Sequence, residues 1–167
     1  EYKKLIYIGI GSNLTGLKQE TPLYNCQKAI IYLKKEVKVK KISSWYQSQP
    51  IPISNQPWYV NGIAEIETKK NPIHLLNFLI KIEKIFGRIR KKRNESRIID
   101  LDIVDYKNQI ISLKERLYIP HPRMHKRAFV LLPLQEINPL WVHPINNIII
   151  SSLIKKLDKK QKIKKII

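Results

Sequence analysis

The chain has 167 residues, enough for one domain with a hydrophobic core, and its 32 basic and 13 acidic residues give a net charge of +19. A single cysteine, Cys26, excludes an internal disulfide and suits a reducing cytoplasm, where we expect the protein to be located. The apolar runs are too short to span a bilayer, so we expect no membrane association.

The high positive charge attracts nucleic acids, anionic membranes or phosphorylated small molecules. Lysines are spread along the whole chain, however, including the stretch IKKLDKKQKIKKII near its end. This distribution favours a general compositional bias over a nucleic-acid-binding surface. The informative charges are therefore the arginines and acidic residues at particular positions.

The first half of the chain predicts a strand, a helix and a second strand. Residues 3–10 form a short run rich in β-formers, and Thr21 followed by Pro22 is typical of a helix start. Residues 37–48 open with strict alternation and predict a half-exposed strand. Residues 49–58 contain three prolines and predict a long loop of the kind that often carries function.

The second half repeats this pattern. Residues 59–68 alternate as a strand, and a helix begins at Asn71-Pro72 and ends at Gly87. A basic loop over 88–96 leads to a strand over 97–106. The order β-α-β-β-α-β predicts an α+β ferredoxin-like sandwich with extra C-terminal elements, formed by one domain over residues 1–167.

Two aspartates stand inside the apolar run RIIDLDIVDY. Asp100 and Asp102 share one face of the predicted strand, roughly 6.5–7 Å apart along it. Two carboxylates this close repel each other unless cations lie between them, and a small set of oxygen ligands suits Mg²⁺ together with phosphate oxygens. The alternative is a pair of solvated acids, or of partners for nearby lysines.

Other charged side chains near this strand strengthen the metal hypothesis. Guanidinium groups bind phosphate oxygens in pairs, and arginine is the scarcer basic residue in this lysine-rich chain. Acidic residues for a metal together with arginines for phosphates indicate a nucleotide polyphosphate site. The neighbours are Glu83, Arg88, Arg90, Arg97, His121 and Arg127.

A second cluster combines aromatic and amide side chains. Tyr59 and Asn61 share a strand face, and Phe129 follows later in the sequence. An aromatic ring that stacks and an amide that forms hydrogen bonds can together bind a flat heterocycle. The alternative is that both aromatic residues belong to the core and that Asn61 serves a turn.

Six motifs resemble, in order, those of 6-hydroxymethyl-7,8-dihydropterin pyrophosphokinase of folate biosynthesis. The resemblance covers about residues 4 to 141, and its motifs are YIGIGSNL, SSWYQSQPI, QPWYVNG, LLNFLIKIEKIFGRIR, RIIDLDIV and IPHPRMHKRAFVLLPLQEINP. It implies an ATP-dependent enzyme that transfers pyrophosphate from ATP to the hydroxymethyl group of the pterin and releases AMP. It also implies the ferredoxin-like fold that the element order predicts.

The resemblance implies a role for each candidate residue. Asp100 and Asp102 would hold two Mg²⁺ ions. From the charge of the loop over 88–96 and its lack of apolar anchors, we further hypothesise that Arg88 and Arg97 close over the phosphates and act with the aspartates in catalysis. The pterin would contact Asn13, Ser48, Tyr59, Asn61 and Phe129. ATP would contact Glu83, Arg88, Arg90, Arg97, His121 and Arg127.

Two other hypotheses remain open at the level of sequence. The same element order occurs in RNA-recognition domains, although the Lys/Arg-Gly-Phe pattern of their exposed aromatic residues does not occur here. The second hypothesis is that the chain is an inactive relative of the pyrophosphokinase family. We expect the pterin and ATP as partners, no nucleic acid, and a monomer.

Overall fold

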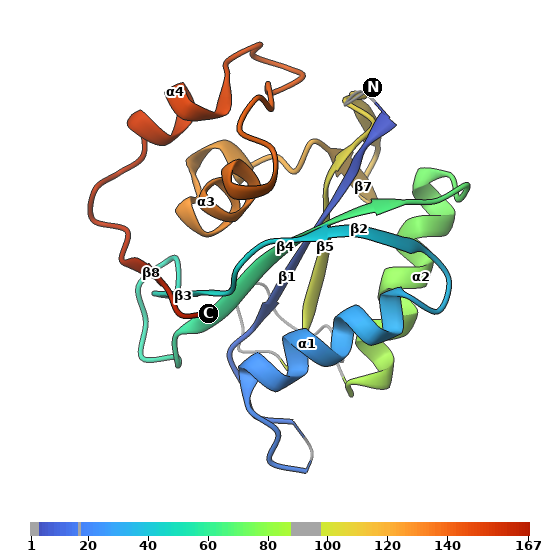
Figure 1. Cartoon of the computed structure of the whole chain (residues 1–167), viewed down its shortest axis with the longest axis vertical. Helices are drawn as coiled ribbons and strands as arrows, with labels where there is room; N and C mark the ends of the chain where they lie inside the picture. The colour runs from blue at the N-terminus through green and yellow to red at the C-terminus, as the bar shows by residue number, and fades with distance from the viewer. Residues whose placement is uncertain (1–3, 17, 88–97) are drawn as a thin grey trace.

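A computed structural model describes residues 4–16, 18–87 and 98–167 (Figure 1). The elements follow the predicted α+β order as far as β5, and the additional C-terminal elements come after it. In chain order they are β1 (Ile6–Ser12), α1 (Pro22–Leu33), β2 (Lys38–Ile42), β3 (Tyr46–Ser48), β4 (Tyr59–Glu67), α2 (Pro72–Ile85), β5 (Asp100–Tyr106), β6 (Ile111–Leu113), β7 (Leu117–Ile119), a 3₁₀ turn η2 (Met124–Lys126), α3 (Ala128–Ile137), α4 (Ile150–Lys155) and β8 (Ile163–Lys165).

The main sheet is antiparallel and has the strand order β5-β1-β4-β3-β8, with β2 also paired to β4. The order β5-β1-β4-β3 corresponds to that of a ferredoxin-like sheet, so the predicted fold class is confirmed. Strand β8 was not predicted, and it extends the sheet beyond β3.

Helices α1 and α2 start where the sequence predicts. The hydroxyl of Thr21 accepts a hydrogen bond from the Tyr24 N–H at 3.1 Å, and the Asn71 side chain accepts one from the His74 N–H at 2.9 Å. Gly87 follows α2 with φ of 82°, a left-handed conformation that favours glycine and ends the helix.

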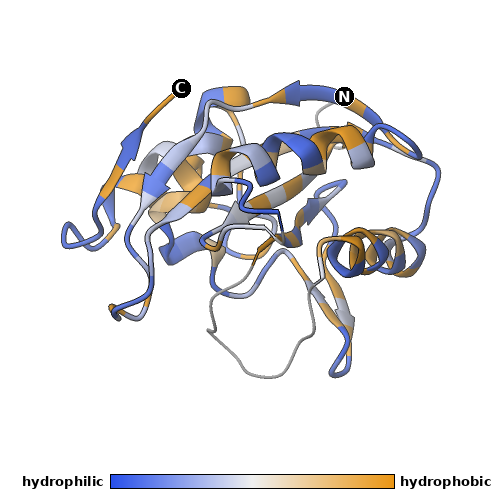
Figure 2. Ribbon diagram, turned by 90° about the horizontal axis from the view of Figure 1, so that it is seen from below, coloured by the Kyte–Doolittle hydropathy of each residue, from blue (hydrophilic) through white to orange (hydrophobic). Residues whose placement is uncertain are grey.

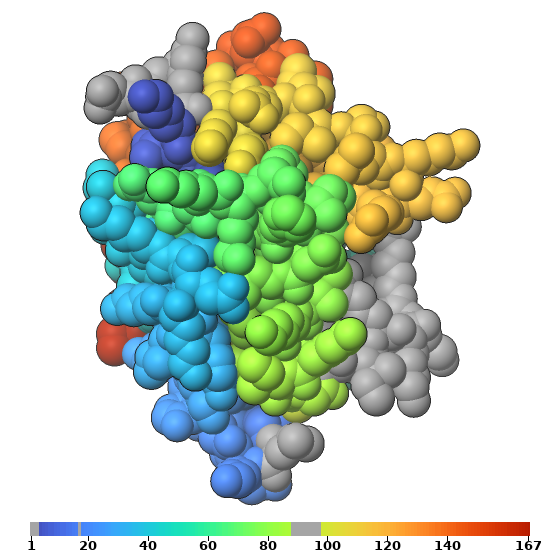
Figure 3. Space-filling model, turned by 90° about the vertical axis from the view of Figure 1, so that its right-hand side faces the viewer, coloured from blue at the N-terminus to red at the C-terminus, as the bar shows by residue number. Residues whose placement is uncertain are grey.

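One face of the sheet is covered by α1 and α2, which lie side by side in Figure 3. Tyr32 of α1 and Phe86 just after α2 meet edge to face, with ring centroids 5.6 Å apart. Figure 2 shows hydrophobic and hydrophilic residues alternating along the helical ribbons, the pattern expected of helices with one buried side. Leu101 and Ile103 point into this core, as the alternation of β5 predicts.

The opposite face is partly covered by α3 and α4 (Figure 1). Buried polar contacts hold this layer in place. The Trp141 indole N–H donates to Asp105 Oδ2 at 2.9 Å, Asn138 Nδ2 donates to the Tyr7 hydroxyl at 3.0 Å, and that hydroxyl donates to Glu65 Oε1 at 3.0 Å. Over the other half of this face the sheet is not covered by α3, and a cleft lies there.

One detail differs from the expectations. The predicted strand over 37–48 is divided into β2 and β3, because Trp45 turns inward against Gly62 and the Ser43 hydroxyl accepts a hydrogen bond from the Ile63 N–H at 2.9 Å. None of the helices in the part of the chain that the structure describes is long and apolar enough to cross a membrane.

Candidate active site

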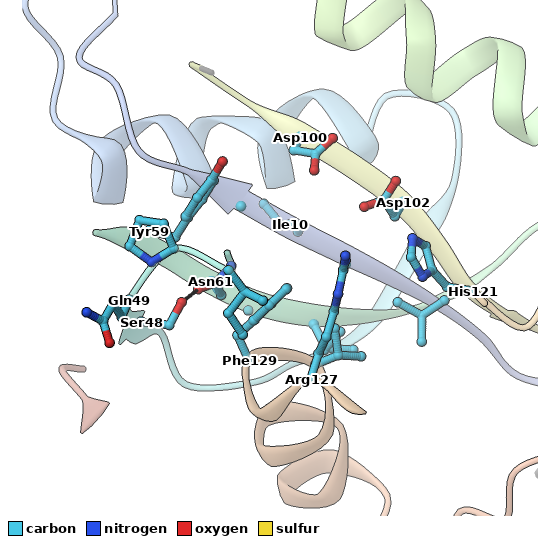
Figure 4. A pocket seen from close by; sticks show the side chains of 18 of the residues that line it. Ile10, Ser48, Gln49, Tyr59, Asn61, Asp100, Asp102, His121, Arg127 and Phe129 are labelled. Carbon is cyan, nitrogen blue, oxygen red and sulfur yellow. Dashed lines mark hydrogen bonds between the residues drawn. The ribbon is translucent and has the colours of Figure 1, made fainter. Parts of the chain in front are cut away.

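A cleft that is partly open to solvent lies over the ends of β1, β4 and β5 (Figure 4). Eight residues proposed from the sequence line it: Ser48, Tyr59, Asn61, Asp100, Asp102, His121, Arg127 and Phe129.

Strands β4 and β5 supply the two polar ends of the cleft. The period of two places Tyr59 and Asn61 on the cleft side of β4, and Asp100 and Asp102 on the cleft side of β5. Strand β1 runs between them, paired to both, and presents Gly9 and Gly11. The sheet therefore separates an aromatic and amide end from an acidic end with a strip of bare backbone.

The orientation of Asn61 is set by Ser48. The Ser48 hydroxyl donates a hydrogen bond to Asn61 Oδ1, and both side chains are buried. This contact assigns Nδ2 to the other side of the amide, toward Gly11, where a Cβ would lie 3.1 Å from Nδ2. Asn61 can therefore offer hydrogen-bond donors to a ligand on the cleft floor.

The wall opposite β4 comes from the start of α3. Phe129 and Arg127 both line the cleft, and the Arg127 guanidinium carbon lies 5.4 Å from the centre of the Phe129 ring. In Figure 4, Phe129 lies across the cleft from Tyr59, and Arg127 extends toward the acidic end. A flat ring that enters between Tyr59 and Phe129 would be sandwiched by two aromatic faces.

His121 lies beside the acidic end. Its Nδ1 accepts a hydrogen bond from the Arg123 N–H at 3.3 Å, which leaves Nε2 as the nitrogen that carries the proton in the neutral ring. Burial lowers the pKa of His121 to about 4, and nearby Arg127 adds to this effect while Asp100 opposes it. At neutral pH His121 is therefore an uncharged hydrogen-bond donor.

The carboxylates of Asp100 and Asp102 are the donor set that could hold a metal. They are half-buried on one strand face, beside Gly9 and Gly11. Two carboxylates on an open face suit Mg²⁺, which completes its shell with water and phosphate oxygens.

Two other predicted residues do not line the cleft. Asn13 donates to Gln56 Oε1 at 3.1 Å and to the Pro57 carbonyl at 3.2 Å, so it holds the loop before β4. Glu83 is buried on α2, and its Oε2 accepts a hydrogen bond from the Leu101 N–H at 3.0 Å. The remaining candidates, Arg88, Arg90 and Arg97, lie outside the described residues.

The sequence predicted that the loop over 49–58 carries function but singled out none of its residues, and it missed the glycine floor of the cleft. The loop before β4 closes one end, and β1 forms the floor. The glycines of this floor lie in the motif YIGIGSNL, but the sequence assigned them no role in the site. The residues not predicted are Gly9, Ile10, Gly11, Gln49, Pro50, Ile51, Pro52, Ser54, Gln56, Gly62, Ile63, Val104 and Val130.

Comparison with known proteins identifies relatives over most of the chain. A sequence profile described as 7,8-dihydro-6-hydroxymethylpterin-pyrophosphokinase (HPPK) matches residues 7–139. The 2-amino-4-hydroxy-6-hydroxymethyldihydropteridine pyrophosphokinase of Haemophilus influenzae is 44% identical over 150 residues, which are 90% of this chain and 91% of that protein. The Bacillus subtilis protein of the same name is 39% identical over 133 residues, covering 80% of this chain and 77% of its own length.

Solved structures show the same fold. The wild-type HPPK-DHPS of Plasmodium falciparum matches with a TM-score of 0.68 and 14% sequence identity. The match covers 91% of this chain but 40% of that longer one.

Proposed function

Since the chain belongs to the 7,8-dihydro-6-hydroxymethylpterin-pyrophosphokinase family, we propose that the cleft described above is where it transfers pyrophosphate from ATP to hydroxymethyldihydropterin in folate biosynthesis. The observation that carries this assignment is the convergence, in one cleft, of an aromatic and amide end with an acidic end. The first suits the pterin and the second suits the triphosphate of ATP.

The pterin binds at the end formed by β4 and α3. Its ring stacks between Tyr59 and Phe129, and Asn61, oriented by Ser48, donates hydrogen bonds to the acceptors on its edge. Asn13 acts indirectly, because it holds the loop that closes this end.

ATP binds at the acidic end together with Mg²⁺. Asp100 and Asp102 would hold two Mg²⁺ ions, which when bound would supply positive charge against the phosphate oxygens. Arg127 contacts phosphate oxygens, and neutral His121 donates a hydrogen bond from Nε2. The resemblance adds Glu83, Arg88, Arg90 and Arg97 to the ATP contacts, with Arg88 and Arg97 acting on the transferred group.

The reaction is an in-line displacement. The hydroxymethyl oxygen of the pterin forms a bond to the β-phosphorus of ATP, the bond from that phosphorus to the oxygen that joins it to the α-phosphorus breaks, and AMP leaves. The hydroxyl proton is released to solvent. Positioning and charge neutralisation carry such a transfer, so the chain needs no strong general base.

We place this activity in the cytosol, carried out by a monomer and without nucleic acid. Two observations support this placement. ATP is the co-substrate, and Cys26 is a free, buried thiol of the kind that persists in a reducing compartment.

The direct test is to incubate the protein with MgATP and 6-hydroxymethyl-7,8-dihydropterin and to separate the nucleotides by anion-exchange chromatography. We expect AMP and the pterin diphosphate in equal amounts, with no AMP when the pterin is omitted or the metal is chelated. Formation of ADP would show transfer of a single phosphoryl group, and no nucleotide product would refute the proposed function.

Asp100→Ala tests the acidic end. We expect turnover to fall by about 100-fold or more, because metal-held phosphates account for several kcal/mol of transition-state stabilisation. The fold should persist, since the change removes one of two mutually repelling carboxylates. The measurements are the rate of AMP formation and the midpoint of thermal unfolding. The control is Glu67→Ala, which removes an exposed acid at the far end of β4. Wild-type turnover in Asp100→Ala would remove this residue from catalysis.

A further inference from the structure

One side chain from the C-terminal segment reaches the start of α3. The Gln161 amide forms two hydrogen bonds there: Oε1 accepts from the Ala128 N–H at 2.9 Å, and Nε2 donates to the Lys126 carbonyl at 2.9 Å. These two partners flank Arg127, so a single amide holds both sides of the residue whose guanidinium lines the cleft.

The start of α3 depends on this contact. Arg127 occupies the N-cap position in an extended conformation, with φ of −116° and ψ of 112°, and makes no side-chain capping hydrogen bond. The first N–H groups of a helix need partners from outside the helix. Gln161 supplies one from 33 residues away in the sequence, where Ser, Thr, Asp or Asn would normally act locally.

The residues next to Gln161 bind the opposite wall of the cleft. The Lys162 carbonyl accepts a hydrogen bond from the Gln49 N–H at 3.0 Å, and Ile163 of β8 pairs with Ser48 of β3. Both Ser48 and Gln49 line the cleft. Three consecutive residues, 161–163, therefore connect the wall that carries Arg127 and Phe129 to the wall that carries Ser48.

We propose that Gln161 is a positioning residue for pterin binding, which sets the separation of the two walls by clamping the start of α3. This inference rests on the proposed function for the identity of the ligand. Residues 161–163 lie beyond residues 7–139, the span that the family profile matches, so the family assignment alone does not include this connection.

The test compares Gln161→Ala with the wild-type protein. We expect the dissociation constant of the pterin, measured at equilibrium without ATP, to rise about five- to tenfold, the effect of losing one helix cap. The KM for the pterin should rise in parallel, and kcat at saturation should fall less than this, because Asp100 and Asp102 on β5 are not held by Gln161 as Arg127 is. A general loss of folding would instead lower kcat and leave the KM unchanged.

Two variants serve as controls. Lys160→Ala removes an exposed neighbouring side chain, and the pterin dissociation constant should not change. Gln161→Glu keeps an acceptor for the Ala128 N–H but loses the donor to the Lys126 carbonyl, so its dissociation constant should fall between those of Gln161→Ala and the wild type. Wild-type affinity in Gln161→Ala, or equal effects in Gln161→Ala and Lys160→Ala, would refute the proposal.

Hydrogen exchange separates this proposal from the proposed function. The Ala128 amide should exchange faster in Gln161→Ala than in Lys160→Ala, whichever ligand the cleft binds. A wild-type protein that makes no AMP would refute the proposed function but leave this comparison interpretable. Unchanged exchange at Ala128 in an active enzyme would refute the clamp alone.

Discussion

At the level of single residues, the two glycines of β1, Gly9 and Gly11, matter as much as the polar groups beside them. A Cβ added to Gly11 would lie 3.1 Å from Asn61 Nδ2 and 3.8 Å from the Tyr59 ring. Asn61 cannot easily move away, because its amide is buried and bonded to Ser48. The open floor at Gly11 is therefore part of the end of the cleft that we propose binds the pterin.

Gly11→Ala should raise the KM for the pterin about tenfold and change the KM for ATP much less. The added methyl group occupies the floor and presses on the Asn61 donor, a misplacement worth about 1.4 kcal/mol. Steady-state kinetics with each substrate varied in turn measure both constants.

Gly9→Ala is the matched control. Its Cβ would meet Val104 at 3.2 Å and Ile63 at 3.8 Å, away from Asn61, so the KM for the pterin should change less than in Gly11→Ala. Equal effects of the two substitutions would show that Gly11 has no particular role at the pterin end.

At the level of elements, the contact between α2 and β5 supports the aspartate strand from outside the cleft. Strand β5 is at one edge of the main sheet. The N–H of Leu101, the residue between the two aspartates, donates to Glu83 on α2 at 3.0 Å. Glu83 thus satisfies a backbone donor that would otherwise be buried at a sheet edge.

Glu83→Ala should lower the free energy of unfolding by about 1–3 kcal/mol, the cost of a buried donor left unsatisfied. It should also raise the Mg²⁺ concentration needed for half-maximal activity, because β5 is held less firmly. Glu83→Gln retains an acceptor for the Leu101 N–H, so its free energy of unfolding and its Mg²⁺ requirement should stay close to those of the wild type. Denaturant unfolding and Mg²⁺ titration measure these effects.

A different outcome would support the role that the family resemblance implies for Glu83. If the side chain serves ATP alone, Glu83→Ala would raise the KM for ATP and leave the free energy of unfolding unchanged. The two measurements together therefore assign Glu83 to the nucleotide, to β5, or to both.

The sequence predicted the regular elements well and the irregular ones poorly, for a physical reason. Thr21 and Asn71 cap their helices locally, so their signal lies within a few residues. The break between β2 and β3 depends on Trp45 packing against Gly62, and β8 depends on pairing with β3. Such contacts join distant parts of the chain and leave no local pattern.

The same distinction applies to the cleft. Tyr59, Asn61, Asp100 and Asp102 were predicted because strand alternation and functional groups coincide at these positions. Gly11 is hard to recognise from the sequence, because it contributes open space to the cleft and has no functional group. Residue type and the family motif placed Glu83 at the nucleotide, but neither could reveal its contact with β5.

At the level of the whole molecule, the sheet has a core on each face, and the core beneath α3 contains an acid. Asp105 is buried, and its Oδ2 accepts a hydrogen bond from the Trp141 indole. Burial raises the pKa of Asp105 to about 6, although hydrogen bonds from Trp141 and from the backbone of Tyr106 and Asn108 act in the opposite direction. The folded protein therefore carries a buried carboxylate at neutral pH.

Asp105→Asn should change how stability depends on pH. The folded protein binds a proton at Asp105 more tightly than the unfolded chain does, because the folded-state pKa is about 6 and the ordinary value is 3.8. The stability that the folded protein gains in this way is fully present below pH 3.8 and is lost as the pH rises through 6. The free energy of unfolding of the wild type relative to Asp105→Asn should fall by up to about 3 kcal/mol between pH 4 and pH 7.

Denaturant unfolding at several pH values measures this difference. Subtracting the two proteins cancels the contributions of His121 and His143, whose pKa values burial lowers to about 4. Asp158→Asn, which changes an exposed acid, is the control, and its free energy of unfolding should vary with pH as that of the wild type does. If the curve for Asp105→Asn also ran parallel to that of the wild type, the prediction would be contradicted.

The three tryptophans occupy three different environments, and this distribution has a spectroscopic consequence. Trp45 and Trp141 are buried in separate cores, whereas Trp58 is 37% exposed in the loop directly before Tyr59. Fluorescence emission from Trp58 is thus open to quenchers such as iodide, and the other two indoles are shielded. A ligand that draws this loop toward the cleft should therefore lower the emission of Trp58 or its quenching by iodide. The emission of Trp45 and Trp141 should stay constant and serve as an internal reference.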